Sequence, residues 1–514
     1  MKAARMAAIA VSAAALAAAS YADVALAPVF GDGMVLQRGT EIRVWGKAAP
    51  GETVVVRFGG EKASAAVSDD GTWLVELPPM RECREGRVLE AASYLPQPAS
   101  WRNGWGVLGP GEKTGEASIK DVLVGEVWFC SGQSNADCPV WGRNPRYRDG
   151  MGALALQMNR RPLVRFAVTP HTWATEPKPD VSVKWRAAMP GLFEDFKHGA
   201  SMPSAIGYYY AVCLFDALDI PIGFVDSSVG GTNIDSWTPR SGLETRPDLA
   251  DVLGWKPVDA ATWTPEMKKG PISSGIQQPT VLWNGMVAAF APMAIRGFIW
   301  YQGCTNSGEP QRYCSKMHAL YNGWAREFRN PSLKLYFVQL APWGYSKIAA
   351  IQEAQAEFDA EEPNAGMAVI NDLGNLKDIH PNDKRTVAMR LAAHALKRDY
   401  GFSEIRDNSP TLREWTVEDG AFVLTFADAE GWYVYTPDRS IQTGFEVAGE
   451  DGKFVPAQIE GIENDRSTVA GPVLKVFSKD VPDPKRLRYL HSSPWFGNLY
   501  NESGLPLGAF KIGE

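Results

Sequence analysis

One serine in the chain stands where a nucleophile could act. Ser134 lies in the stretch GQSNAD, directly after the apolar run VLVGEVWFCS. A serine hydroxyl can attack an ester carbonyl when a base accepts its proton and hydrogen-bond donors stabilise the oxyanion. The same residue type caps helices, and the short stretch on its own favours a capping serine. The assignment therefore depends on whether the chain supplies a base and donors.

Histidine is the usual base near neutral pH, and the chain has 6. His380 lies in the polar loop NDLGNLKDIHPND, directly after the strand-like run GMAVI. An α/β enzyme places its catalytic base in such a loop, which makes His380 the candidate. The remaining histidines lie in no comparable polar loop: His171, His198, His318, His394 and His491. Of these, His394 falls inside the helical pattern of 384–400.

Two further polar loops could supply donors. DSSVGGTNIDSW follows the run IGFV, and Gly230 and Gly231 would let the backbone approach a ligand closely. WYQGCTN follows RGFI and carries the amides of Gln302 and Asn306. Each loop alone is equally well explained as a tight turn with capping amides. Together with the loops of Ser134 and His380, they indicate one site.

The elements that would position these loops alternate in type between about 120 and 400. Apolar runs of strand length are followed by helical stretches such as SAIGYYYAVCLFDAL and DKRTVAMRLAAHALKRDY. This alternation predicts an α/β fold with a parallel sheet. Ligands bind such sheets beyond the carboxyl ends of the strands, where all four polar loops fall.

The whole chain has 514 residues, enough for roughly two to four domains. Near the start, short runs in which apolar and polar residues alternate are separated by the turn signals APGE and SDDG, which predicts a small β-sandwich. Patterns typical of β-strands return after about residue 409. The predicted parts are a signal peptide, an N-terminal β-sandwich, a linker, an α/β domain and a C-terminal β domain, at 1–22, 23–95, 96–119, 120–405 and 406–514.

The first residues predict export. Lys2 and Arg5 precede an Ala-rich apolar run that ends in Ser20-Tyr21-Ala22, a small-x-small cleavage pattern. Export to the periplasm or outside the cell would let the 6 cysteines pair, although no C-x-x-C occurs and no zinc site is expected.

A net charge of −7 argues against nucleic acid or an acidic membrane as the partner.

Four blocks in order, VLVGEVWFCSGQSN, GGTNIDSW, GFIWYQGCTN and DIHPNDK, resemble the sialate O-acetylesterase family within the SGNH (GDSL-type) hydrolases. The resemblance covers nearly the whole chain after the leader. It implies a flavodoxin-like parallel sheet core and a serine esterase that needs no metal or cofactor. Ser134 would be the nucleophile and His380 the base.

The resemblance also implies the supporting groups. The oxyanion hole would combine the backbone N–H groups of Ser134 and Gly231 with the side chain of Asn306. The remaining pocket residues would be Gln133, Gln302 and Gly230.

The group that orients His380 stays open at this point. The family commonly carries Asp three residues before the histidine, where this chain has Lys377. Asp378 lies two residues before His380, on the same side of an extended segment. Asp372 or a backbone carbonyl near 378 are the alternatives.

The chain departs from the family pattern at two positions. Ala136 replaces the usual Met after GQSN, and Cys304 replaces the usual Glu after WYQG. We hypothesise that Cys304 pairs with another cysteine, with Cys138 as the candidate partner, and fixes its loop.

Three functions compete on these grounds. The leading one is an exported esterase that removes O-acetyl groups from sialic acids. The second is a deacetylase of xylan or another polysaccharide with the same catalytic residues. The third is a carbohydrate-binding protein with a weak or dead site. All three predict an O-acetylated sugar as partner, with no nucleic acid and no membrane after removal of the leader.

Overall fold

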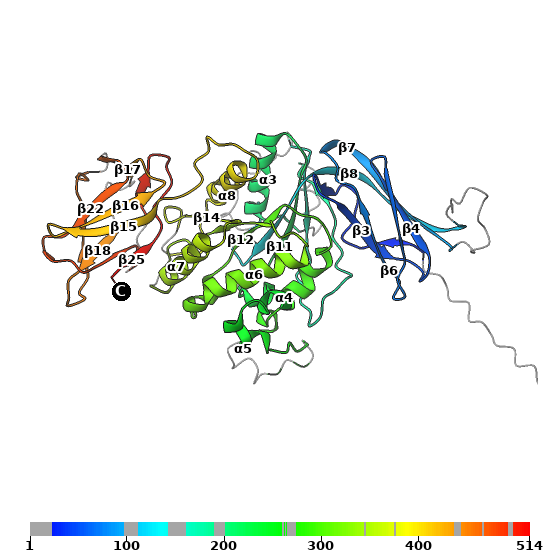
Figure 1. Cartoon of the computed structure of the whole chain (residues 1–514), viewed down its shortest axis with the longest axis horizontal. Coiled ribbons are helices and arrows are strands. Elements are labelled where there is room, and N and C mark those ends of the chain that lie inside the picture. Colours follow the sequence, from blue (N-terminus) through cyan, green and yellow to red (C-terminus); the bar gives the residue numbers. More distant parts are fainter. Residues whose placement is uncertain are drawn as a thin grey trace, which may run out of the picture.

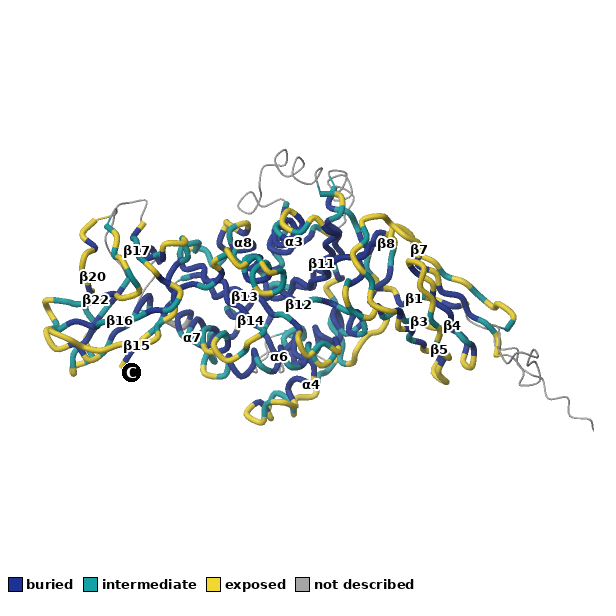
Figure 2. The backbone as a smooth tube through the Cα atoms, turned by 45° about the horizontal axis from the view of Figure 1, so that its top comes forward, coloured by how far each residue is buried: buried dark blue, intermediate teal, exposed yellow. Residues whose placement is uncertain are grey.

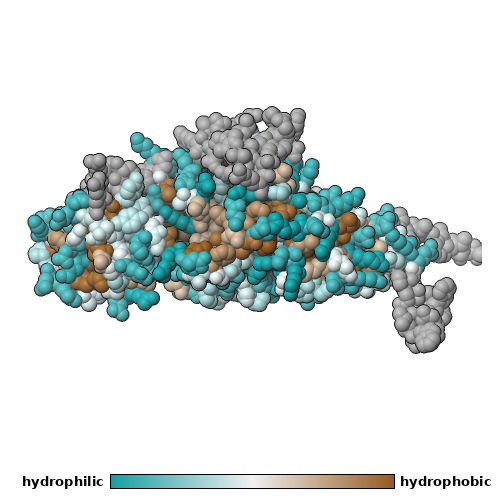
Figure 3. Space-filling model, turned by 90° about the horizontal axis from the view of Figure 1, so that it is seen from above, coloured by the Kyte–Doolittle hydropathy of each residue, from teal (hydrophilic) through white to brown (hydrophobic). Residues whose placement is uncertain are grey.

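The computed structural model describes most of the chain after residue 22. The described residues are 23–96, 111–141, 161–189, 201–259, 262, 264, 274–343, 346–374, 377–435, 444–464, 467–491 and 497–513. They form three parts in a row, with an α/β part between two β parts (Figure 1). Apolar surface gathers along the α/β part (Figure 3). The predicted signal peptide lies outside the described residues.

A parallel sheet forms the central part. In spatial order its strands are β9 (Val164–Val168), β11 (Ile222–Ser228), β8 (Lys113–Gly132), β12 (Gly297–Tyr301), β13 (Lys334–Val338) and β14 (Ala365–Ala368). The short strand β10 (Arg186–Ala187) pairs antiparallel with β9 at the edge. The run from β11 to β14 has the strand order of a flavodoxin-like sheet, with β9 added beyond β11. Every residue of β11 and β12 is buried, as expected for strands covered on both faces.

Four helices cover the two faces of this sheet. Helices α3 (Ala205–Leu218) and α8 (Lys384–Arg398) lie on one face, and α6 (Tyr313–Glu327) and α7 (Ser346–Glu361) on the other (Figures 1 and 2). Ser204 caps α3 by accepting the N–H of Gly207, and Asp383 caps α8 by accepting that of Thr386. Two single-turn helices, α4 (Arg240–Leu243) and α5 (Ala250–Leu253), lie between β11 and β12.

Four of the described N-terminal strands join the central sheet, and three form a sheet of their own. They are β1 (Ala25–Leu26), β2 (Val35–Gln37), β3 (Ile42–Lys47), β4 (Thr53–Phe58), β5 (Glu61–Ala66), β6 (Thr72–Leu77) and β7 (Cys83–Tyr94). Strands β1, β3 and β6 form one sheet, while β4, β5 and β7 extend the sheet of β8. One hydrophobic core runs from Val24 to Ala395 through both parts.

Strand β8 crosses the boundary that was predicted between the linker and the α/β domain. Its first residues, from Lys113 to Ile119, pair with β7, so the strand passes through the expected boundary at 119/120. This half has few apolar side chains because much of its surface is exposed, whereas the half from Val122 is buried throughout. The sequence therefore showed only the second half as a strand. The stretch 97–110 lies outside the described residues.

The C-terminal part has its own hydrophobic core. Its three small sheets contain β15 (Thr411–Glu418), β16 (Ala421–Ala427), β22 (Val473–Phe477) and β20 (Gln458–Ile459); β21 (Thr468–Ala470), β17 (Gly431–Val434) and β24 (Leu499–Asn501); and β19 (Val455–Pro456), β18 (Phe445–Ala448), β23 (Arg486–Tyr489) and β25 (Phe510–Ile512). Among the described residues, no helix has the length and apolar character needed to cross a membrane.

Candidate active site

Ser134 lies in a turn at the carboxyl end of β8. Gly132 ends the strand with φ +137°, and a Cβ there would come within 2.3 Å of the Tyr301 carbonyl oxygen, so a glycine is required. The N–H groups of Ala136 and Asp137 both donate to the Gln133 carbonyl and close the turn. No helix follows within the described residues up to 141, so Ser134 is not a helix cap there.

His380 and Asp378 reach Ser134 from the loop between β14 and α8. The Ser134 Oγ lies 2.9 Å from His380 Nε2, and His380 Nδ1 lies 3.0 Å from Asp378 Oδ1. The backbone N–H of His380 also donates to Asp378 Oδ1 over 3.1 Å, which fixes the carboxylate beside its own loop. With the ring proton on Nδ1, the lone pair of Nε2 can accept the serine proton.

The structure places the alternative carboxylate elsewhere. Asp372 accepts two hydrogen bonds from the guanidinium of Arg390, at 2.6 and 2.7 Å. Both carboxylate oxygens of Asp372 are therefore used in an ion pair with α8. Of the three alternatives open at the sequence level, the Asp378 side chain is the group that lies against the imidazole.

A buried lysine joins the two catalytic loops. Lys384 Nζ donates to Asn135 Oδ1 on the Ser134 turn and, over 2.7 Å, to the Pro381 carbonyl beside His380. Asn135 Nδ2 donates in turn to the Ile379 carbonyl over 3.1 Å. Only 2% of Lys384 is exposed, and this burial lowers its pKa to about 8. Lys384 and Asn135 thus cross-link the nucleophile to the base, a role that the sequence did not reveal.

Asn306 is held in one orientation by its neighbours. Its Oδ1 accepts the Ile234 N–H at 3.1 Å and the Gln302 side-chain amide at 2.7 Å, so Nδ2 must point the other way. One hydrogen of Nδ2 goes to Glu309 Oε1, at 2.8 Å. The second hydrogen of this amide is the one that an oxyanion could use.

Gln302 has a different role from the predicted one. Its side chain is fully buried, and its amide donates to Asn306 Oδ1 and the Thr232 carbonyl. Its Oε1 accepts the Tyr313 hydroxyl at 2.8 Å. With donors and acceptor used inside the protein, Gln302 positions Asn306 and does not line an open pocket.

Gln133 is also largely committed to the protein interior. It is 4% exposed, and its Oε1 accepts the N–H groups of Gly303 and Thr305 at 3.2 and 3.4 Å. Gln133 thereby ties the Ser134 turn to the loop that carries Asn306.

The two glycines of the neighbouring loop differ in their surroundings. Gly230 lies against the nucleophile, since a Cβ there would be 3.5 Å from the Cβ of Ser134. Its N–H donates to Asp137 Oδ2 over 3.2 Å and is therefore occupied. Gly231 is exposed, with φ +74°, and its carbonyl accepts the Gln277 side-chain amide. Because the Gly230 N–H is occupied, Gly231 remains the expected backbone donor of this loop.

An acidic group that no sequence pattern marked lies beside the nucleophile. Asp137 Oδ1 lies 3.5 Å from Nε2 of His171, and Oδ2 accepts the Gly230 N–H. Burial raises the pKa of Asp137, while the positive charge of His171 and the Gly230 N–H oppose that rise. His171 follows β9, the strand added to the flavodoxin-like order, so only the observed strand pairing brings it here.

The predicted cysteine pairing is wrong in this structure. All 6 cysteines are free thiols, including Cys304 and Cys138. Burial raises the pKa of Cys304 to about 12 and that of Cys138 to about 11, so both stay neutral near pH 7. Each thiol interacts electrostatically with Lys384. The loop of Cys304 is fixed by the hydrogen bonds of Gln133 instead.

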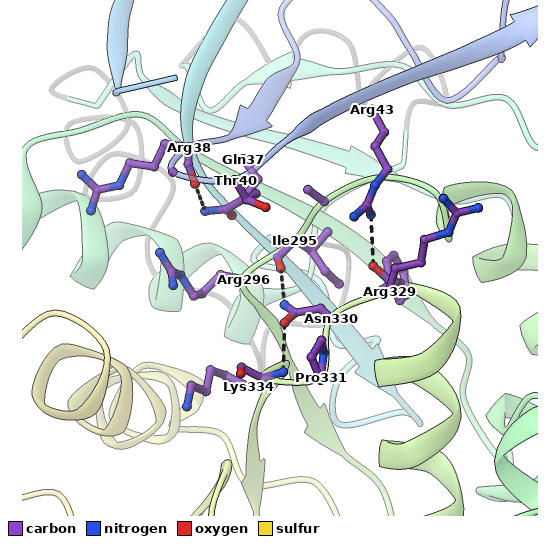
Figure 4. Close-up of a pocket in the computed structure, with 14 residues that line it drawn as sticks. Gln37, Arg38, Thr40, Arg43, Ile295, Arg296, Arg329, Asn330, Pro331 and Lys334 are labelled. Carbon is purple, nitrogen blue, oxygen red and sulfur yellow. Dashed lines mark hydrogen bonds between the residues drawn. The ribbon is translucent and has the colours of Figure 1, made fainter. Parts of the chain in front are cut away.

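A cationic cavity of about 330 Å³ lies at the opposite edge of the sheet (Figure 4). It contains Arg296 and Lys334, at the amino ends of β12 and β13, and Arg38 from the N-terminal part. The buried Glu126 binds Arg38 at 2.6 Å and Arg296 at 3.0 Å. These ion pairs join the two parts of the molecule, and the cavity holds none of the predicted site residues.

Comparison with known proteins places the chain among carbohydrate esterases. Residues 124–397 match the family model described as carbohydrate esterase, sialic acid-specific acetylesterase. The human sialate O-acetylesterase is 29% identical over 466 residues, covering 83% of this chain and 80% of the human one. The mouse sialate O-acetylesterase is 27% identical over 437 residues, covering 76% and 77%. A carbohydrate acetylesterase from Xanthomonas citri has a similar structure, with a TM-score of 0.76, 28% identity, and coverage of 95% and 99%.

Proposed function

The chain belongs to the carbohydrate esterase family of sialic acid-specific acetylesterases, and we propose that it is an exported enzyme that releases acetate from O-acetylated sialic acids through an acetyl-Ser134 intermediate. Its membership makes it a carboxylic-ester hydrolase that acts on carbohydrates. The SGNH-type serine mechanism, the substrate and the export are the proposed parts. The observation that carries the mechanism is the hydrogen-bonded series Ser134, His380 and Asp378.

In the acylation step, Ser134 Oγ attacks the acetyl carbonyl carbon while His380 Nε2 accepts the hydroxyl proton. Asp378 stabilises the imidazolium that forms. The carbonyl oxygen becomes an oxyanion, which the N–H groups of Ser134 and Gly231 and the Asn306 amide would stabilise. Each such donor is typically worth about 2.7–4 kcal/mol.

The tetrahedral intermediate then collapses. The bond from carbon to the sugar oxygen breaks, and His380 returns its proton to that oxygen, so the sugar leaves as an alcohol. In deacylation, water attacks acetyl-Ser134 with His380 again as the base. Acetate leaves and the Ser134 hydroxyl is restored, without any group from outside the protein except water.

A second substrate class is favoured by one feature of the site. Asp137 lies beside Ser134 and, when ionised, would repel the carboxylate of a sialic acid. A neutral O-acetylated polysaccharide such as acetylxylan would meet no such repulsion. His171 Nε2 lies 3.5 Å from this carboxylate, so the balance between the two substrates depends on the pair.

The test is acetate release from 9-O-acetylated sialic acid and from acetylated xylan. We expect the mature protein to act on the sialic acid and the Ser134→Ala variant to act on neither. Ser307→Ala, on the neighbouring loop, is the matched control. Release from xylan alone would retain the mechanism and change the substrate, in which case Asp137→Asn should raise activity on the sialic acid. No release from either would favour a carbohydrate-binding protein.

Export is tested separately. We expect the protein expressed with its leader to be recovered outside the cytoplasm, with a mature N-terminus at or near Asp23. Recovery of the intact leader in the cytoplasmic fraction would contradict it.

A further inference from the structure

Three potential metal-binding side chains converge on the face of the sheet covered by α6 and α7. Cys314 and His318 lie one turn apart on α6, and Glu361 is the last residue of α7. His318 Nε2 is 2.8 Å from Glu361 Oε2, and Cys314 Sγ is 3.8 Å from the same oxygen. All three donor atoms lie within 4.8 Å of one another. Thiolate, imidazole and carboxylate are the three ligand types that zinc takes in proteins.

The separations are close to those of a bound zinc ion. Zinc-to-ligand distances of about 2.0–2.3 Å at tetrahedral angles put neighbouring donor atoms about 3.3–3.6 Å apart. The two separations to Glu361 Oε2, 2.8 and 3.8 Å, lie on either side of this range, and a bound ion would draw Cys314 Sγ and the His318 nitrogen, which lie within 4.8 Å of each other, toward it. Phe358 packs edge-on against the His318 ring, with centroids 4.8 Å apart, and limits its rotation.

The charge at this position also suits a cation. Burial raises the pKa of the Cys314 thiol most, the carboxylates of Glu357 and Glu361 raise it further, and the cation Arg246 lowers it. Arg246 is itself bound to Ser315, at 2.9 Å. A divalent ion would neutralise the carboxylate of Glu361 and permit the thiolate to form.

We propose that Cys314, His318 and Glu361 form a zinc site that fastens α6 to α7, with water in the fourth position. The ion would stabilise structure and take no part in the reaction. Cys314 follows Tyr313, whose hydroxyl supports Gln302 and through it Asn306. A fastened start of α6 would therefore steady one wall of the active site. The site carries no C-x-x-C motif, because its ligands lie on two different helices.

The test is zinc binding by tag-free full-length protein, measured by competition with a chromogenic chelator. We expect one zinc per chain in the wild type and in Cys213→Ala, a control thiol on α3. The Cys314→Ala/His318→Ala variant should lose this binding, and Glu361→Gln should weaken it by more than about tenfold. Zinc should raise the melting temperature of the wild type and not that of the double variant.

Glu361→Gln distinguishes loss of a ligand from loss of folding. This side chain is 53% exposed, so its replacement leaves the hydrophobic core intact. The absence of stoichiometric zinc binding by the wild type would overturn the proposal. Equal zinc affinity in the wild type, the double variant and Glu361→Gln would also overturn it. Either result would leave the esterase mechanism unaffected.

Discussion

Replacing Lys384 by Met tests whether the catalytic loops are held together by the buried ammonium. Met has a similar length but cannot donate to Asn135 Oδ1 or to the Pro381 carbonyl. Lowering the Lys384 pKa from 10.5 to about 8 corresponds to a cost of about 3 kcal/mol for the buried charge. Met removes that cost. It also leaves two acceptors without their donor, at about 1–3 kcal/mol each. The two effects largely offset, so we expect a small change in the free energy of unfolding.

Catalysis should change far more than stability. A misplacement of about 1 Å between reacting groups can cost about 100-fold in rate. We therefore expect Lys384→Met to lower kcat by about 10–100-fold on a chromogenic acetyl ester, with KM nearly unchanged. Lys377→Met is the matched control, since Lys377 is an exposed lysine of the same loop. Wild-type kcat in Lys384→Met would refute this reasoning, as would a loss of kcat fully explained by unfolding.

The shifted pKa adds a second readout. Between about pH 8 and 10.5 the unfolded chain binds a proton at Lys384 that the folded chain does not. The contribution of this group to stability therefore rises with pH through that window, and below it the buried charge stays destabilising. The difference in unfolding free energy between wild type and Lys384→Met should shift in favour of the wild type over the same window. A difference that is constant with pH would contradict the lowered pKa.

The remaining predictions concern the oxyanion donor, the base and a buried carboxylate. Asn306→Ala should lower kcat by about 10²–10³-fold in the same assay, and an unchanged kcat would remove Asn306 from the oxyanion hole. Asp378→Asn should lower kcat by up to about 10⁴-fold while Asp372→Asn affects mainly stability, and the reverse order would contradict the assignment of Asp378. Burial raises the pKa of Asp226 to about 7, so the folded state retains a proton there that the unfolded chain loses above about pH 4. Stability from this group should fall as pH rises to about 7, and Asp226→Asn should show a weaker decline in melting temperature between pH 5 and 7.

The sequence was sufficient to predict the parallel sheet and the polar loops at the carboxyl ends of its strands. Strands covered on both faces are continuous apolar runs, as in IGFV and GFIW, and the polar loop after each run marks a carboxyl end. The base loop was found because His380 follows such a run. The first half of β8 was missed because its side chains alternate between partly and fully exposed positions.

Other features depend on tertiary contacts that no local pattern carries. Lys384 begins an amphipathic helix and would ordinarily be exposed, yet the Ser134 turn covers it. Asp137 and His171 meet because β9 pairs with β11. The predicted pairing of Cys304 failed because pairing requires a specific geometry between two cysteines, which spacing along the chain does not define.

The central claim is that Ser134 becomes acetylated during turnover. The most direct measurement is rapid acid quenching of the enzyme during hydrolysis of an acetyl ester, followed by intact-mass analysis and peptide mapping. We predict one acetyl group per chain, located on Ser134, absent from Ser134→Ala and accumulating further in a His380→Ala variant that can be acylated by a strongly activated ester. Turnover with no acetyl group on Ser134, or an acetyl group on another residue that disappears as acetate is released, would contradict the account.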